Sequence, residues 1–156
     1  MKTPPNFNIV IADTTCFILL EKIGEMELLR SVFDNIITTD IVAAEYGFPL
    51  PNWVEIRKVA DIHLQEVLQI EVDAGEASAI ALATELSPAL LVLDDLEARR
   101  LARQLNLNYT GTLGVVLRAK WSGQIESVKP IMARIQNTNF RITDQLYLDV
   151  LKQAEE

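Results

Sequence analysis

Asn8-Ile9-Val10-Ile11-Ala12-Asp13-Thr14-Thr15 is the stretch from which the fold can be inferred. Its four consecutive apolar residues, without polar alternation, are typical of a strand buried on both faces in the centre of a parallel sheet. Asp13 follows directly and is expected at the carboxyl edge of that sheet, where open α/β sheets bind ligands. The plainer alternative is that Asp13 belongs only to the turn, with Thr14 or Thr15 capping the next helix.

The rest of the chain alternates between strand and helix patterns. Short apolar or β-branched runs predict strands over 35–40, 52–59, 89–93 and 107–110, with 52–59 near a sheet edge. Spacing and composition predict helices over 15–20, 25–32, 41–46, 62–70, 73–86, 96–105, 115–121, 128–135 and 143–154. The alternation predicts a parallel sheet covered on both faces, and the length of 156 residues suits a single domain.

Acidic residues stand at the ends of these elements. Asp13, and the pair Asp94 and Asp95, follow the two strongest strand patterns, while Glu45 and Glu76 lie near the starts of helices. Because the carboxyl ends of parallel strands share one edge, these acids are expected to converge. Carboxylates without basic partners repel one another, and a bound cation relieves that repulsion. Oxygen ligands without His or Cys suit Mg²⁺ or Mn²⁺, and paired ions of this kind can activate water for phosphodiester hydrolysis.

Most of these acids also have a purely structural interpretation. Glu76 completes an approximate capping box with Asp73, Asp94 suits the N-cap of the 96–105 helix, and Asp40 fits a cap better than a ligand. Glu45 is hardest to explain in this way, because the apolar run before it should be buried. No single acid is specific, but the ordered set with two members at strand ends favours a site.

Five motifs, in this order, resemble PIN domains, in particular the VapC-like branch of uncharacterised PIN proteins. The motifs lie at 10–15, 39–45, 73–83, 91–99 and 111–116, within a core of about 8–120 that C-terminal helices follow at about 127–154. The resemblance implies a three-layer α/β/α fold with a central parallel sheet. It also implies a ribonuclease dependent on Mg²⁺ or Mn²⁺, often the toxin of a toxin–antitoxin pair, and a homodimer.

The resemblance assigns the acids one by one. Asp13 matches the first acid of the family and Glu45 the second, and Glu76 stands where most PIN domains have Asp. The fourth acid is Asp94 or Asp95, since the spacing from Glu76 favours the former and the position after the strand favours the latter. These five are the expected catalytic and metal-holding residues.

Hydroxyl and basic residues extend the expected site. Thr15 matches the hydroxyl position near the first acid, and Thr112 is expected to face the same pocket. Arg99, Arg100 and Arg103 lie on the polar side of the 96–105 helix and could neutralise RNA phosphates. The equally good alternative is that these arginines only cover an exposed helix face.

Composition restricts the functional classes. Apolar residues make up 49% and the formal net charge is −8, which argues against binding nucleic acid through a broad basic surface but not against a carboxylate-based nuclease. A single cysteine, Cys16, and a single histidine, His63, exclude thiolate metal sites and zinc sites built on several His. No apolar run is long enough for a membrane span and no signal peptide is visible, so we expect a cytoplasmic protein.

The expected partners are an RNA substrate, an antitoxin protein and a second copy of the chain, with no membrane. One rival is a catalytically degenerate PIN scaffold that binds a protein or RNA partner. The other is a phosphoryl-transfer domain of the receiver or haloacid-dehalogenase type. Thr15 stands where the dehalogenase type needs its second Asp, and the acidic pair of a receiver would come earlier in the chain.

Overall fold

The sheet is parallel throughout and has β1 at its centre. The computed structural model describes residues 6–156, which contain five strands in the order β3-β2-β1-β4-β5. The strands are β1 (Ile9–Ala12), β2 (Asn35–Thr39), β3 (Val54–Arg57), β4 (Leu90–Val92) and β5 (Asn108–Thr110). Val10 pairs with Ile36 on one side and with Leu90 on the other. The predicted central strand and the predicted edge strand are both confirmed.

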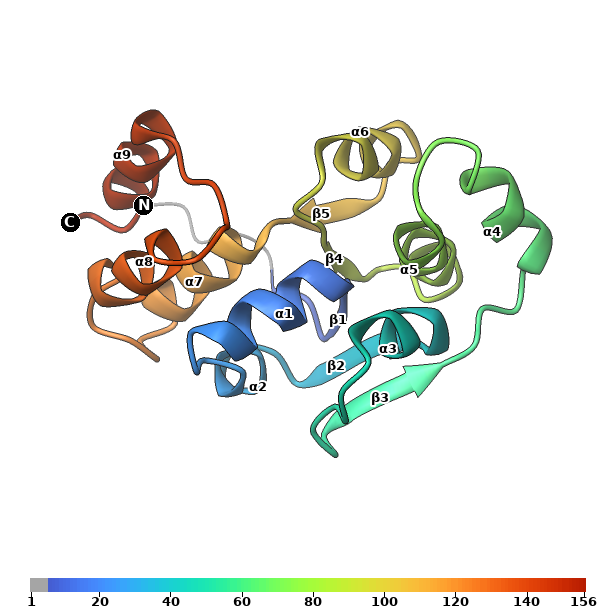
Figure 1. The fold of residues 1–156 in the computed structure, drawn as a ribbon, viewed down its shortest axis with the longest axis horizontal. Coiled ribbons are helices and arrows are strands. Elements are labelled where there is room, and N and C mark those ends of the chain that lie inside the picture. Colours follow the sequence, from blue (N-terminus) through green and yellow to red (C-terminus); the bar gives the residue numbers. More distant parts are fainter. Residues whose placement is uncertain (1–5) are drawn as a thin grey trace.

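Helices cover both faces of the sheet and give the predicted three-layer α/β/α arrangement (Figure 1). They are α1 (Thr14–Lys22), α2 (Glu27–Val32), α3 (Asp40–Tyr46), α4 (Ile62–Leu68), α5 (Ala74–Glu85), α6 (Leu96–Gln104), α7 (Thr112–Trp121), α8 (Lys129–Gln136) and α9 (Asp144–Gln153). Within residues 6–156, none of these helices has the length and apolar character needed to cross a bilayer.

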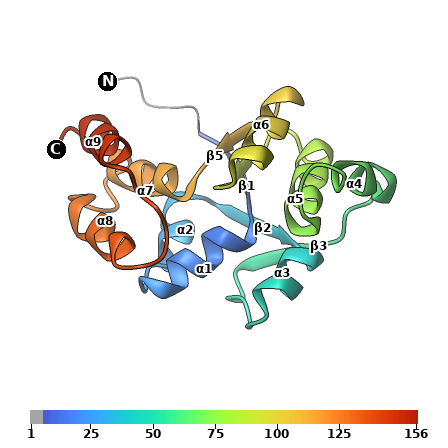
Figure 2. The same ribbon diagram turned by 45° about the horizontal axis from the view of Figure 1, so that its top comes forward.

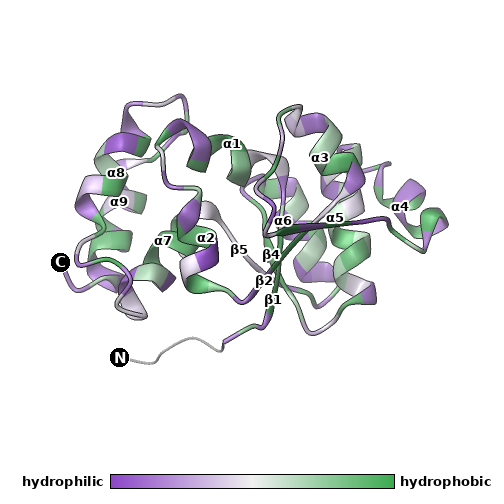
Figure 3. Cartoon of the chain, turned by 90° about the horizontal axis from the view of Figure 1, so that it is seen from below, coloured by the Kyte–Doolittle hydropathy of each residue, from purple (hydrophilic) through white to green (hydrophobic). Residues whose placement is uncertain are grey.

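Alternation along the strands divides the core into two parts. Val10 and Ala12 of β1 pack into a cluster with α1, α2 and α7, whereas Ile11 packs into a cluster with α5 and α6. Successive side chains of a strand point to opposite faces, so an unbroken apolar run is what a doubly covered strand requires. Figure 3 shows this as apolar colour along the central strands.

Helix N-caps differ from the sequence predictions in three places. Asp13, in extended conformation, precedes α1, so neither Thr14 nor Thr15 is the cap. Thr39 rather than Asp40 caps α3, with its hydroxyl accepting a hydrogen bond from the Val42 N–H. Asp95 rather than Asp94 caps α6. In each case the strand or loop ends one residue away from the predicted point, and the last extended residue takes the cap position.

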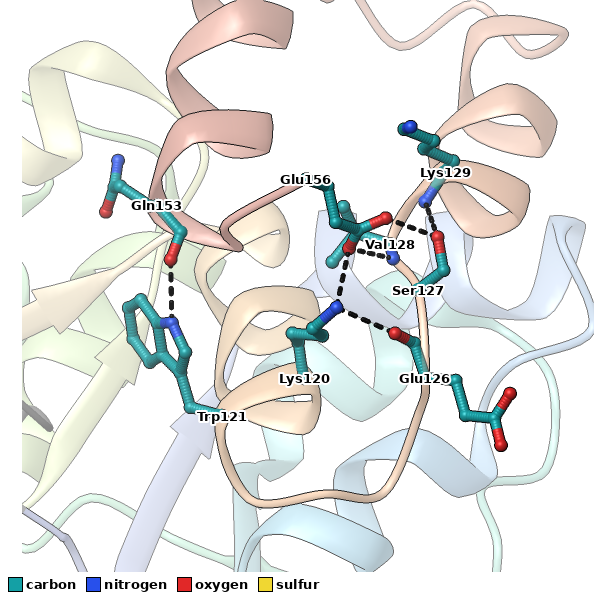
Figure 4. A network of polar contacts seen from close by, with 8 residues as sticks. All are labelled: Lys120, Trp121, Glu126, Ser127, Val128, Lys129, Gln153 and Glu156. Carbon is teal, nitrogen blue, oxygen red and sulfur yellow. Dashed lines mark hydrogen bonds and ion pairs between the residues drawn. The ribbon is translucent and has the colours of Figure 1, made fainter. Parts of the chain in front are cut away.

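Helices α8 and α9 lie beside α7 at one end of the molecule (Figure 2). The Glu156 side chain, which follows α9, binds to α7 and to the residues before α8. Its carboxylate accepts hydrogen bonds from the Ser127 hydroxyl, the Val128 N–H at 2.8 Å and the Lys120 ammonium at 3.2 Å (Figure 4). Burial alone would raise the pKa of Glu156, but these hydrogen bonds and the Lys120 charge outweigh it and lower the pKa to about 2.

Glu156→Gln is expected to lower the free energy of unfolding at pH 7 by about 1 to 3 kcal/mol, because it weakens charge-assisted hydrogen bonds. The carboxyl pKa is about 2 in the folded chain against 4.5 as a reference, so the unfolded chain binds the proton first as pH falls. The stabilisation is therefore present above pH 4.5 and lost between 4.5 and 2. Urea unfolding at several pH values measures this, with Glu155→Gln at the exposed neighbouring position as control. Equal losses at pH 7 and at pH 2 would contradict it.

Candidate functional site

The predicted acids converge at the carboxyl edge of the sheet. Asp13 follows β1, Asp94 follows β4, and Glu45 comes from α3, which follows β2. The charges of Glu45 and Asp94 both raise the pKa of Asp13, as expected for groups that lie close together. Asp73, at the start of α5, acts on Asp13 in the same way. The sheet topology thus brings together residues that are far apart in the sequence.

Asp13 is the buried centre of this cluster. Its side chain lies at the edge of the core with 5% of the residue exposed, and Oδ1 has no hydrogen-bond partner within residues 6–156. Burial is the largest cause that raises its pKa, to about 7, against the Thr14 N–H, which lowers it. A buried oxygen without a partner carries a desolvation cost that a hydrogen bond or a cation would remove.

Glu45 is held from two sides although its residue is exposed. The Thr14 hydroxyl donates to Oε2 at 2.9 Å, and the Gly75 N–H donates to Oε1 at 2.9 Å. The run before Glu45 is less buried than predicted, since Ala44 is exposed, so burial of that run does not explain its position. The two hydrogen bonds do, because they aim the carboxylate towards Asp13 and the start of α5.

Glu76 belongs to the capping box at the start of α5 that the sequence predicts, and it also lies close to other acids. Asp73 caps α5 by accepting the Glu76 N–H at 2.8 Å. In the other direction, the Asp73 backbone N–H donates to the Glu76 carboxylate and lowers its pKa, although less than burial raises it. Burial raises the pKa of Glu76 to about 8, and the charges of Asp73, Asp95 and Asp13 add to the effect. Glu76 therefore lies near enough to Asp73, Asp95 and Asp13 for their charges to act on it, and its role as the third acid stays a prediction.

Asp94 and Asp95 have different local roles. Asp94 accepts from the Thr112 N–H at 2.9 Å and from the Thr112 hydroxyl at 2.6 Å, so α7 orients its carboxylate. Asp95 accepts the Ala98 N–H at 3.0 Å and caps α6. A Cβ on Gly111 would lie 2.8 Å from Asp94 Oδ1, so a larger residue at this position would push the Asp94 carboxylate away.

Of the two threonines predicted near the acids, only Thr112 makes a hydrogen bond to one, and Asp73 was not predicted as part of the site. Thr14, not Thr15, contacts an acid directly, and Thr112 is fully buried against Asp94. Asp73 was predicted as a helix cap only, yet its charge raises the pKa of both Asp13 and Glu76. Its place at the start of the same helix as Glu76 was the signal that could have identified it.

The arginines of α6 are partly engaged elsewhere. Arg100 pairs with Glu97 at 2.6 Å, and the Arg99 guanidinium lies over the Tyr109 ring at 5.4 Å. Arg103 is exposed. None of the three lines the hollow beside the acids, so the structure brings them less close to the site than the sequence suggested.

A groove of about 470 Å³ opens beside the acids. We use the word groove for the hollow lined by Thr15, Ile18, Leu19, Lys22, Glu76, Asp94, Asp95, Asn139, Phe140 and Arg141. Three acids line it together with residues of α1 and of the segment between α8 and α9. The acidic cluster is therefore reachable from outside through Glu76, Asp94 and Asp95.

Comparison with protein families gives a match to the PIN domain over residues 9–156. The chain belongs to the PIN domain family. Neither the comparison with curated proteins nor that with solved structures gave a match. PIN domains are generally nucleases and typically use divalent metals, which identifies this fold as a nuclease type. The VapC-like branch stays a prediction.

The oxygen atoms of the acidic cluster in this PIN domain are of the type that binds divalent metals, although the side chains do not form a complete coordination site. Every donor in the cluster is a carboxylate or hydroxyl oxygen, as Mg²⁺ and Mn²⁺ prefer, and Asp13 Oδ1 is buried and without a hydrogen bond. Within residues 6–156, no three His, Cys, Asp or Glu side chains are grouped closely enough to hold an ion as they stand. Direct coordination by three or more of these side chains would require some of them to move towards one another, whereas one or two carboxylates with waters could hold Mg²⁺ as they stand.

Proposed function

We propose that this PIN domain is an endoribonuclease that hydrolyses RNA phosphodiester bonds with Mg²⁺ or Mn²⁺. One observation carries the proposal: the Asp13 carboxylate is buried without a partner for Oδ1, and the charges of Asp73, Glu45 and Asp94 act on it. Such a group is costly in a folded protein unless a cation offsets it. The family match supports the same chemistry at the coarser level of a nuclease.

Each side chain has a definite role in this proposal. Asp13, Glu45, Glu76 and Asp94 would hold the metal, which when bound lowers the pKa of water and neutralises charge on the phosphodiester. Thr14 and the Gly75 N–H orient Glu45, and Thr112 orients Asp94. Asp73 adds negative charge behind Glu76, which favours the binding of cations.

Calorimetric titration with Mn²⁺, with a short non-cleavable RNA present, tests the proposal. Substrate phosphate commonly completes the coordination of such ions. In the titration we expect saturable Mn²⁺ binding. In a separate assay with a cleavable RNA, we expect cleavage that EDTA abolishes and added Mn²⁺ restores. No Mn²⁺ binding together with cleavage unaffected by EDTA would refute a metal-dependent site.

Asp94 rather than Asp95 is expected to be the fourth acid. Asp94→Asn should weaken Mn²⁺ binding by about 10- to 100-fold, the range typical when support of a metal site is lost. Asp95→Asn should change it less and leave stability nearly unchanged, because Asn caps helices as well as Asp does. Titrating the two variants side by side decides between them, and a larger loss in Asp95→Asn would reverse the assignment.

A catalytically degenerate scaffold is the second candidate. The observation that favours it is that no three His, Cys, Asp or Glu side chains within residues 6–156 are grouped as a metal site. It predicts a chain that binds RNA or a protein without Mn²⁺-dependent cleavage, so the titration above also tests it. A toxin role, with an antitoxin partner and a homodimer, belongs to the first candidate and would be favoured by a small antitoxin-like reading frame beside the gene.

A further inference from the structure

The groove leads away from the acids along one face of α1. Thr15, Ile18 and Lys22 are spaced by three and four residues, so they lie on the same face of the helix, and all three line the groove. Asp13 precedes the first turn of α1 and Lys22 ends its last turn. At a rise of 1.5 Å per residue, the two positions are about 13 Å apart along the helix axis. A single phosphate group cannot span that distance.

The segment between α8 and α9 forms the facing wall, and it is anchored to the end of α1. The Lys22 ammonium donates to Asn139 Oδ1 at 3.0 Å. Arg134 of α8 donates to the Ile23 carbonyl at 2.7 Å and pairs with Glu25 at 2.6 Å. These contacts fix the wall opposite α1, so the groove is a built feature and not a gap between independent parts.

Two cations that line the groove, one on α1 and one in the facing wall, form no ion pair with the residues that the structure describes. Lys22 bonds to a neutral amide, and neither Lys22 nor Arg141 has an ion pair within residues 6–156. Arg141 is exposed, and Phe140 beside it is half-buried and lines the same groove. In a chain with a net charge of −8, two groove-lining cations without an ion pair among the described residues, in the same groove as an aromatic ring, suit a polyanion carrying flat bases.

We propose that Lys22, Phe140 and Arg141 form a subsite for single-stranded RNA next to the bond to be cut. The two cations bind a neighbouring phosphate and the Phe140 ring stacks on an unpaired base. The proposal rests on the proposed function, which places the scissile phosphate at the acids. A duplex fits less well, since its bases are already stacked and unavailable to the ring. The groove volume lies within the range of about 300 to 1,000 Å³ typical of ligand sites.

Fluorescence anisotropy with a labelled mixed-sequence single-stranded RNA tests the subsite in EDTA, where metal-dependent cleavage cannot occur. Arg141→Gln should weaken binding about fivefold at 0.1 M salt and reduce the slope of log K against log salt by about 0.7, the value for one single-strand phosphate contact. Phe140→Leu should also weaken binding by about fivefold or more, because a stacked base is lost. The slope should stay unchanged in that variant, and the RNA duplex of the same sequence should bind more weakly than the single strand.

Arg103→Gln is the matched control, because it removes the same charge from an exposed residue outside the groove. A larger loss in Arg103→Gln than in Arg141→Gln would overturn the subsite in favour of α6. Absence of RNA binding by the unaltered chain would also overturn it, and a protein segment would then be the ligand to test for the groove. If Arg141-dependent binding persists but no Mn²⁺-dependent cleavage is found, the proposed ribonuclease function fails and the RNA subsite stands.

Discussion

Asp13→Asn is expected to make the metal-free protein more stable and at the same time inactive. The variant removes a buried negative charge whose burial, together with the charges of Asp73, Glu45 and Asp94, raises its pKa to about 7. The shift from 3.8 is roughly three pKa units, so the gain in free energy of unfolding at pH 7 is up to about 4 kcal/mol. Metal-dependent cleavage should fall by about 100-fold or more, because the central ligand of the proposed site is lost.

The effect on stability should depend on pH in a defined direction. Between pH 3.8 and 7 the folded chain keeps the Asp13 proton that the unfolded chain has lost, so stability of the metal-free protein falls as pH rises. Glu76, with a pKa raised to about 8 mainly by burial, extends this fall to higher pH. In Asp13→Asn the fall over the lower part of the range should be shallower than in the unaltered chain.

Urea unfolding in EDTA across this pH range, compared with cleavage assays in Mn²⁺, measures both effects. Asp144→Asn is the matched control, since Asp144 is exposed in the first turn of α9 and its removal should change neither quantity by much. Mn²⁺ should stabilise the unaltered chain and Asp144→Asn, but not Asp13→Asn. A variant at Asp13 that is less stable without metal, or that still cleaves with Mn²⁺, contradicts the assignment.

Gly75→Ala is expected to lower the cleavage rate without lowering the stability of the fold. A Cβ at this position would lie 2.2 Å from Glu45 Oε2 and 2.8 Å from Oε1, so the flexible Glu45 carboxylate must move away. Alanine is otherwise better than glycine in a helix by up to about 1 kcal/mol, and Gly75 lies in the first turn of α5. Stability should thus stay constant or rise, while the cleavage rate falls by about 100-fold, as expected when a catalytic group is displaced by an ångström.

A double-variant cycle with Glu45→Gln shows whether Gly75 acts through Glu45. If it does, Gly75→Ala should reduce the cleavage rate strongly in the unaltered background but little in the Glu45→Gln background. Additive losses in the two backgrounds would mean that the glycine affects another part of the site. Thermal unfolding of the same four proteins provides the check on folding.

The fold could be predicted from the sequence because its strands and helices carry strong local signals. The unbroken apolar runs of β1 and β4 indicate strands covered on both faces, and the alternating order of elements then leaves a parallel sheet as the simplest arrangement. Cap positions were less predictable. Asp94 and Asp95 are chemically equivalent as caps, and only the point where β4 ends decides that Asp95 takes the position.

The acids of the candidate site could be identified, but not how each one is held. Glu45 depends on the Thr14 hydroxyl and the Gly75 N–H, which lie 31 and 30 residues away in the sequence. No local pattern contains such contacts. The same holds for the cationic end of the groove, because the Lys22–Asn139 hydrogen bond joins residues 117 positions apart.

The anchoring of the groove wall also affects the order in which the molecule can be assembled. The contacts of Arg134 with Ile23 and Glu25 span 111 and 109 positions, so a growing polypeptide contains α1 and most of the acids long before it contains the facing wall. Closing a loop of this length costs more chain entropy than closing a short one, and non-local contacts of this kind slow folding. A growing chain therefore lacks the groove until residues 139–141 have been synthesised and have left the ribosome, however early its acids have emerged.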